Sequence, residues 1–170
     1  MVTAPRFVCL GPGDPGIDPR VAVIAIVRRD FKNFPIERAV ARTRPDGQSL
    51  VNAPTEIFTT VDGKDVIRRA ILGLPVVVTA VARSYTWRFG DGTSIVVAAG
   101  AGPPPALHHP YGRAGDFQVS LDVTYGGTFT VGGSPVVYDV EGTATITGPP
   151  AGLAVREART QLEGGPRPSG

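Results

Sequence analysis

The sequence predicts an all-β protein, an antiparallel β-sandwich preceded by a short helix. Glycine and proline make up 39 of the 170 residues (22 Gly and 17 Pro), which is high for a helical protein and usual for short strands joined by many turns. At least seven runs of β-branched and aromatic residues lie between these turn residues. Hydrophobic residues are 42% and charged residues 19%, so the chain can bury a core, and its length suits one domain, or one domain with appendages.

The first predicted element is a short helix over residues 19–32. Asp18 can accept a hydrogen bond from a free backbone N–H, and Pro19 suits the first helical position. Residues 21–27 are β-branched and favour a strand, but the start signal and the polar residues that follow favour a helix that ends before Pro35. Residues 1–16 are rich in Gly and Pro and are expected to form an irregular arm.

From residue 43 the chain has the pattern of strands. Turn signals at residues 45–47, 62–63 and 73 separate the expected strands 50–60, 66–72, 75–82 and 85–89. Residues 76–81 are apolar on both faces, so this strand is expected deep in a sheet. In the last strand, Tyr85, Trp87 and Phe89 alternate with polar residues and therefore share one face.

A long loop, residues 93–108, is expected next, with a Gly/Pro-rich tip. Residues 117–123 alternate most regularly, and the pairs Gly126-Gly127 and Gly132-Gly133 predict hairpin turns. Further strands are expected at 128–131, 136–140, 143–147 and 153–161.

Two segments carry the most specific pattern. Residues 85–93 read Tyr-Thr-Trp-Arg-Phe-Gly-Asp-Gly-Thr, and residues 109–123 read His-Pro-Tyr-Gly-Arg-Ala-Gly-Asp-Phe-Gln-Val-Ser-Leu-Asp-Val. Together they resemble the paired signature of the PKD (polycystic-kidney-disease-type) domain, an Ig-like β-sandwich. Arg88 departs from the family pattern, which commonly has Asp there, and the loop between the two segments is unusually long.

The resemblance implies a domain organisation. We expect an arm with a short helix over residues 1–45, a PKD-like sandwich over 46–125, C-terminal hairpins over 126–162 that pack on or extend the sandwich, and a disordered tail over 163–170. The whole chain also resembles secreted or envelope-associated PKD-domain proteins of high-GC Gram-positive bacteria, which implies a compartment rather than an activity. The residues that carry this looser likeness are 16–31, 50–55 and 131–133.

The signature residues have structural explanations. The aromatic rings would fill the core, the glycines would allow turns, Asp91 would bond turn N–H groups, and the Tyr111 hydroxyl would reach the backbone as in other sandwiches. The expected structural residues are Trp87, Phe89, Gly90, Asp91, Gly92, His109, Tyr111, Gly115 and Phe117.

No catalytic, cofactor or metal residues are predicted. His108 and His109 are adjacent and would point apart on an extended chain, so His109 is expected to pack near the Asp91 turn. The carboxylates of Asp91, Asp116 and Asp122 could be considered for calcium, but no calcium-loop pattern contains them. Cys9 is the single cysteine and cannot form an internal disulfide.

The number and distribution of charged residues do not favour a nucleic acid as a partner. The formal net charge is +2, and Asp30 and Glu37 interrupt the basic residues near the N-terminus, so these residues are expected on a solvated face. No apolar run is long enough to span a bilayer. The first residues lack a signal-peptide pattern, which taken literally leaves the chain in the cytoplasm, whereas the resemblance implies a secreted or envelope protein.

The function expected from this sequence is a non-catalytic extracytoplasmic module. It would bind an extracellular protein or polysaccharide, or serve as a rigid spacer. The expected binding surface is the loop 93–108 with Pro103, Pro104 and Pro105, and an exposed edge that carries Arg88. One alternative is a structural or assembly subunit that pairs through an edge strand; a hydrolase accessory or an enzyme is the weaker alternative.

Overall fold

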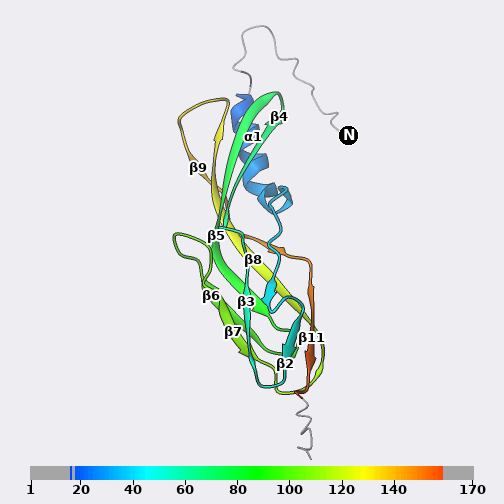
Figure 1. Ribbon diagram of the computed structural model, residues 1–170. Helices are drawn as coiled ribbons and strands as arrows, with labels where there is room; N and C mark the ends of the chain where they lie inside the picture. Colours follow the sequence, from blue (N-terminus) through cyan, green and yellow to red (C-terminus); the bar gives the residue numbers. More distant parts are fainter. Residues whose placement is uncertain (1–15, 17, 159–170) are drawn as a thin grey trace, which may run out of the picture.

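The computed structural model of this protein describes residue 16 and residues 18–158, and it shows an elongated molecule built mainly of strands (Figure 1). In chain order its elements are α1 (Pro19–Asp30), η1 (Phe31–Asn33), β1 (Arg42–Arg44), β2 (Gln48–Leu50), β3 (Pro54–Phe58), β4 (Lys64–Ile71), β5 (Leu74–Arg88), β6 (Ser94–Ala98), β7 (Leu107–Pro110), β8 (Gly115–Val131), β9 (Tyr138–Asp139), β10 (Ala144–Thr147) and β11 (Ala151–Arg156). The prediction of a mostly β chain with one short N-terminal helix is confirmed. The predictions for residues 1–15, including Cys9, and for the tail 163–170 lie outside the described residues.

The strands form two sheets. The smaller has the order β1-β3-β7, and the larger has the order β2-β11-β8-β5-β4, with β6 paired to β5 and both β9 and β10 paired to β8. The pairing of β11 with β2 is parallel, which departs from the expected antiparallel arrangement, and the other pairs are antiparallel. Buried side chains of both sheets belong to one hydrophobic core.

Two long strands, β5 and β8, run through both halves of the molecule (Figure 1). Their register pairs Val76 with Val131 at one end and Arg88 with Ser120 at the other, and it shifts by one residue between Ala82 and Ser84. The predicted break between strands 75–82 and 85–89 is therefore wrong, because a β-bulge lets the strand continue. The predicted hairpin at Gly126-Gly127 is also wrong, because both glycines lie inside β8.

Gly127 does not form a turn; it allows Phe31 of η1 to pack closely on β8. A Cβ atom there would lie 2.6 Å from the Thr79 carbonyl oxygen and 3.3 Å from the Phe31 ring. A glycine inside a strand often marks such a close approach. The sequence contains the glycine pair, but its role depends on which segment lies across the sheet.

The helix covers one face of the upper half of the larger sheet. Asp18 caps it by accepting a hydrogen bond from the Arg20 backbone N–H at 2.9 Å. Val23, Val27 and Phe31 recur every four residues and are buried, so one helical face enters the core. Burial of this face offsets the weak helix preference of the β-branched residues.

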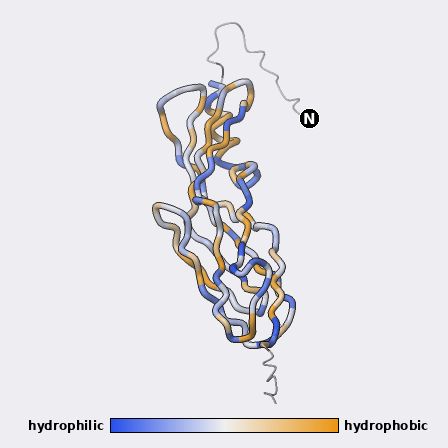
Figure 2. Tube along the Cα trace, viewed as in Figure 1, coloured by the Kyte–Doolittle hydropathy of each residue, from blue (hydrophilic) through white to orange (hydrophobic). Residues whose placement is uncertain are grey.

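The lower half contains the smaller sheet together with β2, β6 and β11 of the larger sheet (Figure 1). Of the expected strand 50–60, only residues 54–58 form a strand, β3, because β2 ends at Leu50 and a turn with Asn52 at a φ of 63° follows it. The expected strands 136–140, 143–147 and 153–161 correspond to β9, β10 and β11, although β11 ends at Arg156, and the expected strand 128–131 is the end of β8. Strands β9, β10 and β11 each pair with β8 and not with one another. Figure 2 shows hydrophobic stretches along the strands of both halves.

Candidate functional site

The signature residues gather at the lower end of β5 around a tight turn. Gly90 and Gly92 have φ of 82° and 95°, which side chains disfavour. Between them, Asp91 accepts hydrogen bonds from the Thr93 backbone N–H at 2.9 Å and the Thr93 hydroxyl at 2.6 Å. The His109 ring nitrogen Nε2 lies 2.7 Å from the other Asp91 oxygen, so β7 is tied to this turn.

Aromatic packing holds the same turn from the inside. The His109 ring stacks on Phe89, with centroids 4.0 Å apart and planes 5° apart, and meets Tyr111 edge-on at 4.8 Å. The Tyr111 hydroxyl donates a hydrogen bond to the Phe89 carbonyl oxygen at 3.0 Å. Trp87, two residues before Phe89 on the same strand, is fully buried. The imidazole is thus part of the packing, with its Nε2 engaged by Asp91.

The electrostatics of the turn follow from these contacts. Burial by itself raises the pKa of the Asp91 carboxyl, but the hydrogen bonds from Thr93 and His109 outweigh burial and lower that pKa to about 2. Burial, with the Asp91 charge nearby, raises the pKa of Tyr111. At neutral pH the turn therefore holds a carboxylate acceptor and a neutral phenol donor, an arrangement that stabilises the structure.

Arg88 was expected on an exposed edge, but its strand, β5, has a neighbouring strand on each side. It pairs with Ser94 of β6 on one side and with Ser120 of β8 on the other. Its Nε donates to Asp122 Oδ2 at 2.9 Å, and the Asp122 side chain is only 9% exposed while that of Arg88 is 59% exposed. Arg88 therefore compensates a buried carboxylate and still presents part of its guanidinium to solvent.

The expected loop 93–108 is partly strand. Residues 94–98 form β6, and β7 begins at Leu107, so the irregular segment is residues 99–106. Pro103 and Pro105 are exposed, but Pro104 is buried, contrary to the expectation of a fully exposed tip. One proline thus anchors the loop while its neighbours face solvent.

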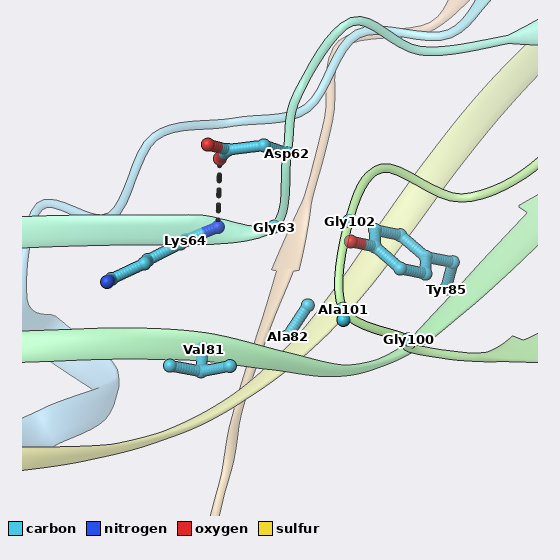
Figure 3. A pocket seen from close by; sticks show the side chains of 9 residues that line it. All are labelled: Asp62, Gly63, Lys64, Val81, Ala82, Tyr85, Gly100, Ala101 and Gly102. Carbon is cyan, nitrogen blue, oxygen red and sulfur yellow. Dashed lines mark hydrogen bonds between the residues drawn. The ribbon is translucent and has the colours of Figure 1, made fainter.

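A pocket of about 260 Å³ lies at the base of this loop (Figure 3). Its walls come from the loop, from the turn before β4 and from the middle of β5. They comprise Asp62, Gly63, Lys64, Val81, Ala82, Tyr85, Gly100, Ala101 and Gly102. Most of the lining residues are small, and Asp62 and Lys64 are the charged ones among them.

Tyr85 gives this pocket an unusual polar group. The Tyr85 side chain is 1% exposed, and within the described part of the chain its hydroxyl has no hydrogen-bond partner. Figure 3 shows the hydroxyl end of the ring turned toward Gly63, where a Cβ atom would overlap the hydroxyl oxygen. Burial, together with the charge of Asp62, raises the pKa of Tyr85. The phenol is therefore a donor at neutral pH.

The three carboxylates considered for calcium have separate partners. Asp91 bonds Thr93 and His109, Asp116 pairs with Arg156 at 3.1 Å, and Asp122 pairs with Arg88. Over residues 18–158, no group of three His, Cys, Asp or Glu side chains is placed to hold a metal ion. None of the helices in that same range is long and apolar enough to cross a membrane.

Two of these features, the Arg88–Asp122 pair and the pocket, were not predicted from the sequence. The Arg88–Asp122 pair has a signal in the sequence, because opposite charges occur on the outward faces of two neighbouring strands. The pocket has no such signal in the sequence, because Asp62, Tyr85 and Gly102 are distant in the chain and meet only through the bulge and the path of the loop.

Comparison with known families gives one finding. The PKD domain family matches residues 69–127, roughly a third of the chain, and the matched range contains both signature segments. The match supports the prediction, made from the two signature segments, of a PKD-domain protein. No curated protein matches the chain.

Proposed function

We propose that this chain is a non-catalytic PKD-domain module, with the two sheets packed as an Ig-like sandwich, that acts outside the cytoplasm. The observation that carries the proposal is the family match over residues 69–127, because PKD domains are generally non-catalytic. The arrangement of the signature supports it: Asp91 and His109, the residues with the chemistry of an acid–base pair, are engaged in turn bonds and ring stacking.

The binding surface in this proposal is the loop 99–106 with the pocket at its base. Loops on a rigid scaffold commonly carry recognition. The exposed Pro103 and Pro105 and the small pocket walls would contact an extracellular protein or a polysaccharide chain, whereas Arg88 lies at the other end of the β5–β6 ladder, outside this surface. The loop is held at a defined position by the buried Pro104, so the surface is ordered before binding.

The shape of the molecule supports a spacer as the second candidate. Because β5 and β8 continue through both halves, the ends are joined by hydrogen-bonded strands and not by a linker (Figure 1). A spacer would need this stiffness without any ligand.

A blocking substitution separates the two candidates. Ala101→Trp would fill the pocket, and Ala114→Trp, at another exposed alanine, is the matched control. We expect Ala101→Trp to reduce binding to isolated cell-wall polysaccharide or to immobilised extracellular proteins at least tenfold, with Ala114→Trp binding like the parent protein. Retention of a partner at unchanged affinity by Ala101→Trp would place the binding surface elsewhere, and absence of binding by all three proteins would favour the spacer.

A further inference from the structure

Strand β6 is an edge strand with one free side. Within the described residues it pairs with β5 alone, in a register that places Ile95 opposite Trp87 and Val96 opposite Thr86. The Phe89 N–H donates to the Thr93 carbonyl and the Ala99 N–H to the Arg83 carbonyl, one bond at each end of the same ladder. Hydrogen-bonded pairs alternate along an antiparallel ladder, so Ile95 and Val97 bond β5. The backbone groups of Ser94, Val96 and Ala98 therefore point away from the sheet.

The side chains of β6 are apolar on both faces. Ile95 shares the core-facing side of the sheet with Trp87 but is 44% exposed, because it lies at the margin of the core. Val96, on the opposite face, is 66% exposed. A strand that presents free backbone groups and branched aliphatic side chains is suited to pairing with a further strand.

Two other edges, β4 and β1, carry charged residues that discourage such pairing, and β6 does not; the uncharged edge β2 has only three residues, Gln48–Leu50. Edge strand β4 contains Lys64, Arg68 and Arg69, and β1 contains two arginines. The five residues of β6 include no charged residue and no proline. The uncharged strand β10 has none of the largely exposed hydrophobic side chains. Charges and prolines on edges prevent unwanted association, so their absence at β6 favours a partner there.

We propose that β6 pairs antiparallel with the β6 strand of a second copy of this chain, about a two-fold axis at Val96. The outward residues 94, 96 and 98 are symmetric about Val96, so Val96 meets its own copy and Ser94 meets Ala98, each as a hydrogen-bonded pair. Ile95 then lies opposite Val97 of the other copy, on the core-facing side. No charge on β6 opposes a copy or selects a foreign strand.

The pairing is small, so the dimer forms at high protein concentration and dissociates on dilution. Stable interfaces bury more than about 1,000 Å² in total, and one five-residue strand pair alone falls short of that area. The pairing does not depend on what the loop 99–106 binds, since a module of either proposed function could use it.

Charge substitutions at the axis test the pairing. Light scattering should show the mass of the wild type rising from one chain of 17.7 kDa toward two as concentration increases. Val96→Lys and Val96→Glu should each remain at one chain, because like charges would meet at the axis, and their mixture should regain the dimer. Val136→Lys, at a valine that is 50% exposed in the turn after β8, is the control and should behave as the wild type.

Cross-linking tests the register. In a Cys9→Ser background, Ser94→Cys and Ala98→Cys should each stay largely uncrosslinked alone and form a disulfide dimer when mixed under mild oxidation. The Cα separation of a hydrogen-bonded antiparallel pair, about 5.5 Å, suits a disulfide. A wild type that keeps the mass of one chain at every concentration would overturn the proposal. A dimer that persists in Val96→Lys, or that cross-links equally in the unmixed variants, would also overturn it.

Discussion

Tyr85 and Tyr111 are equally buried, but only one of the two hydroxyl groups forms a hydrogen bond. Tyr111 donates to the Phe89 carbonyl at 3.0 Å, whereas the Tyr85 hydroxyl has no partner within the described residues. A buried hydrogen bond contributes roughly 1 kcal/mol, and a buried polar group without a partner costs free energy. The alternation of aromatic residues predicts that Tyr85 faces inward, but it does not predict which hydroxyl finds an acceptor.

Removal of each hydroxyl should therefore have different consequences. We expect Tyr111→Phe to lower the free energy of unfolding by about 1–2 kcal/mol, because the Phe89 carbonyl loses its donor. Tyr85→Phe should change it by less than about 0.5 kcal/mol or raise it, because an unpaired hydroxyl is removed. Urea unfolding of both variants and the wild type gives the comparison. Equal losses in the two variants would contradict this assignment of the hydroxyls.

The Asp91 turn should make stability depend on acid pH. The pKa of Asp91 lies at about 2 in the folded chain, below its ordinary value of 3.8. A carboxyl whose pKa is lowered by folding stabilises the fold above the ordinary value, and that contribution disappears as pH falls through the folded value.

Asp91→Asn should reveal this dependence. We expect the wild type to exceed Asp91→Asn in unfolding free energy by about 2 kcal/mol at neutral pH, with the difference shrinking between about pH 4 and pH 2. Unfolding curves measured across this range provide the readout. Asp116→Asn, at an exposed carboxylate, controls for the loss of one charge. A difference that stays constant down to pH 2 would argue against the hydrogen-bonded carboxylate.

At the level of elements, the glycine pair of β8 shows how a turn signal can be overridden. Gly-Gly between apolar runs is typical of a hairpin, but the pairing of β8 with β5 continues through both residues. The two glycines have unequal surroundings. A Cβ at Gly127 would meet the Thr79 carbonyl and the Phe31 ring, whereas one at Gly126 would meet only the side chain of Arg83.

We expect Gly127→Ala to be more destabilising than Gly126→Ala, by about 1–3 kcal/mol, because a backbone carbonyl and a buried ring cannot move aside without strain. The Arg83 side chain can rotate away from a Cβ at Gly126. Thermal unfolding of the two variants provides the measurement, and the intrinsic gain in stability from replacing a strand glycine by alanine is common to both variants. Equal destabilisation would mean that η1 does not pack closely on β8.

At the level of the whole molecule, the two halves share β5 and β8 and should unfold together. Val23, in the half that contains α1, and Leu121, in the half that contains the smaller sheet, are both fully buried in one core. We expect Val23→Ala to lower stability by about 1–3 kcal/mol and Leu121→Ala by about 2–5 kcal/mol. Each should shift one calorimetric transition to lower temperature. A separate early transition in Val23→Ala would show that the helix-bearing half unfolds on its own.

The sequence by itself determined the properties that depend on neighbours along the chain. The cap and proline of Asp18-Pro19 placed the helix, period-two alternation assigned Tyr85, Trp87 and Phe89 to one face, and local turn residues located the turns at residues 45–47, 62–63 and 90–93. These signals are local because caps, pleats and tight turns involve residues within a few positions of each other.

The tertiary structure decided everything that depends on which segments meet. It joined two predicted strands into β5 through a bulge at residue 83, placed Gly127 under the Phe31 ring and gave Arg88 a buried partner in Asp122. It also formed the pocket at Tyr85 and left one side of β6 without a strand from the described residues. The physical reason is that strand pairing and close packing are contacts between distant residues, and a local pattern specifies that a face is apolar without specifying what covers it.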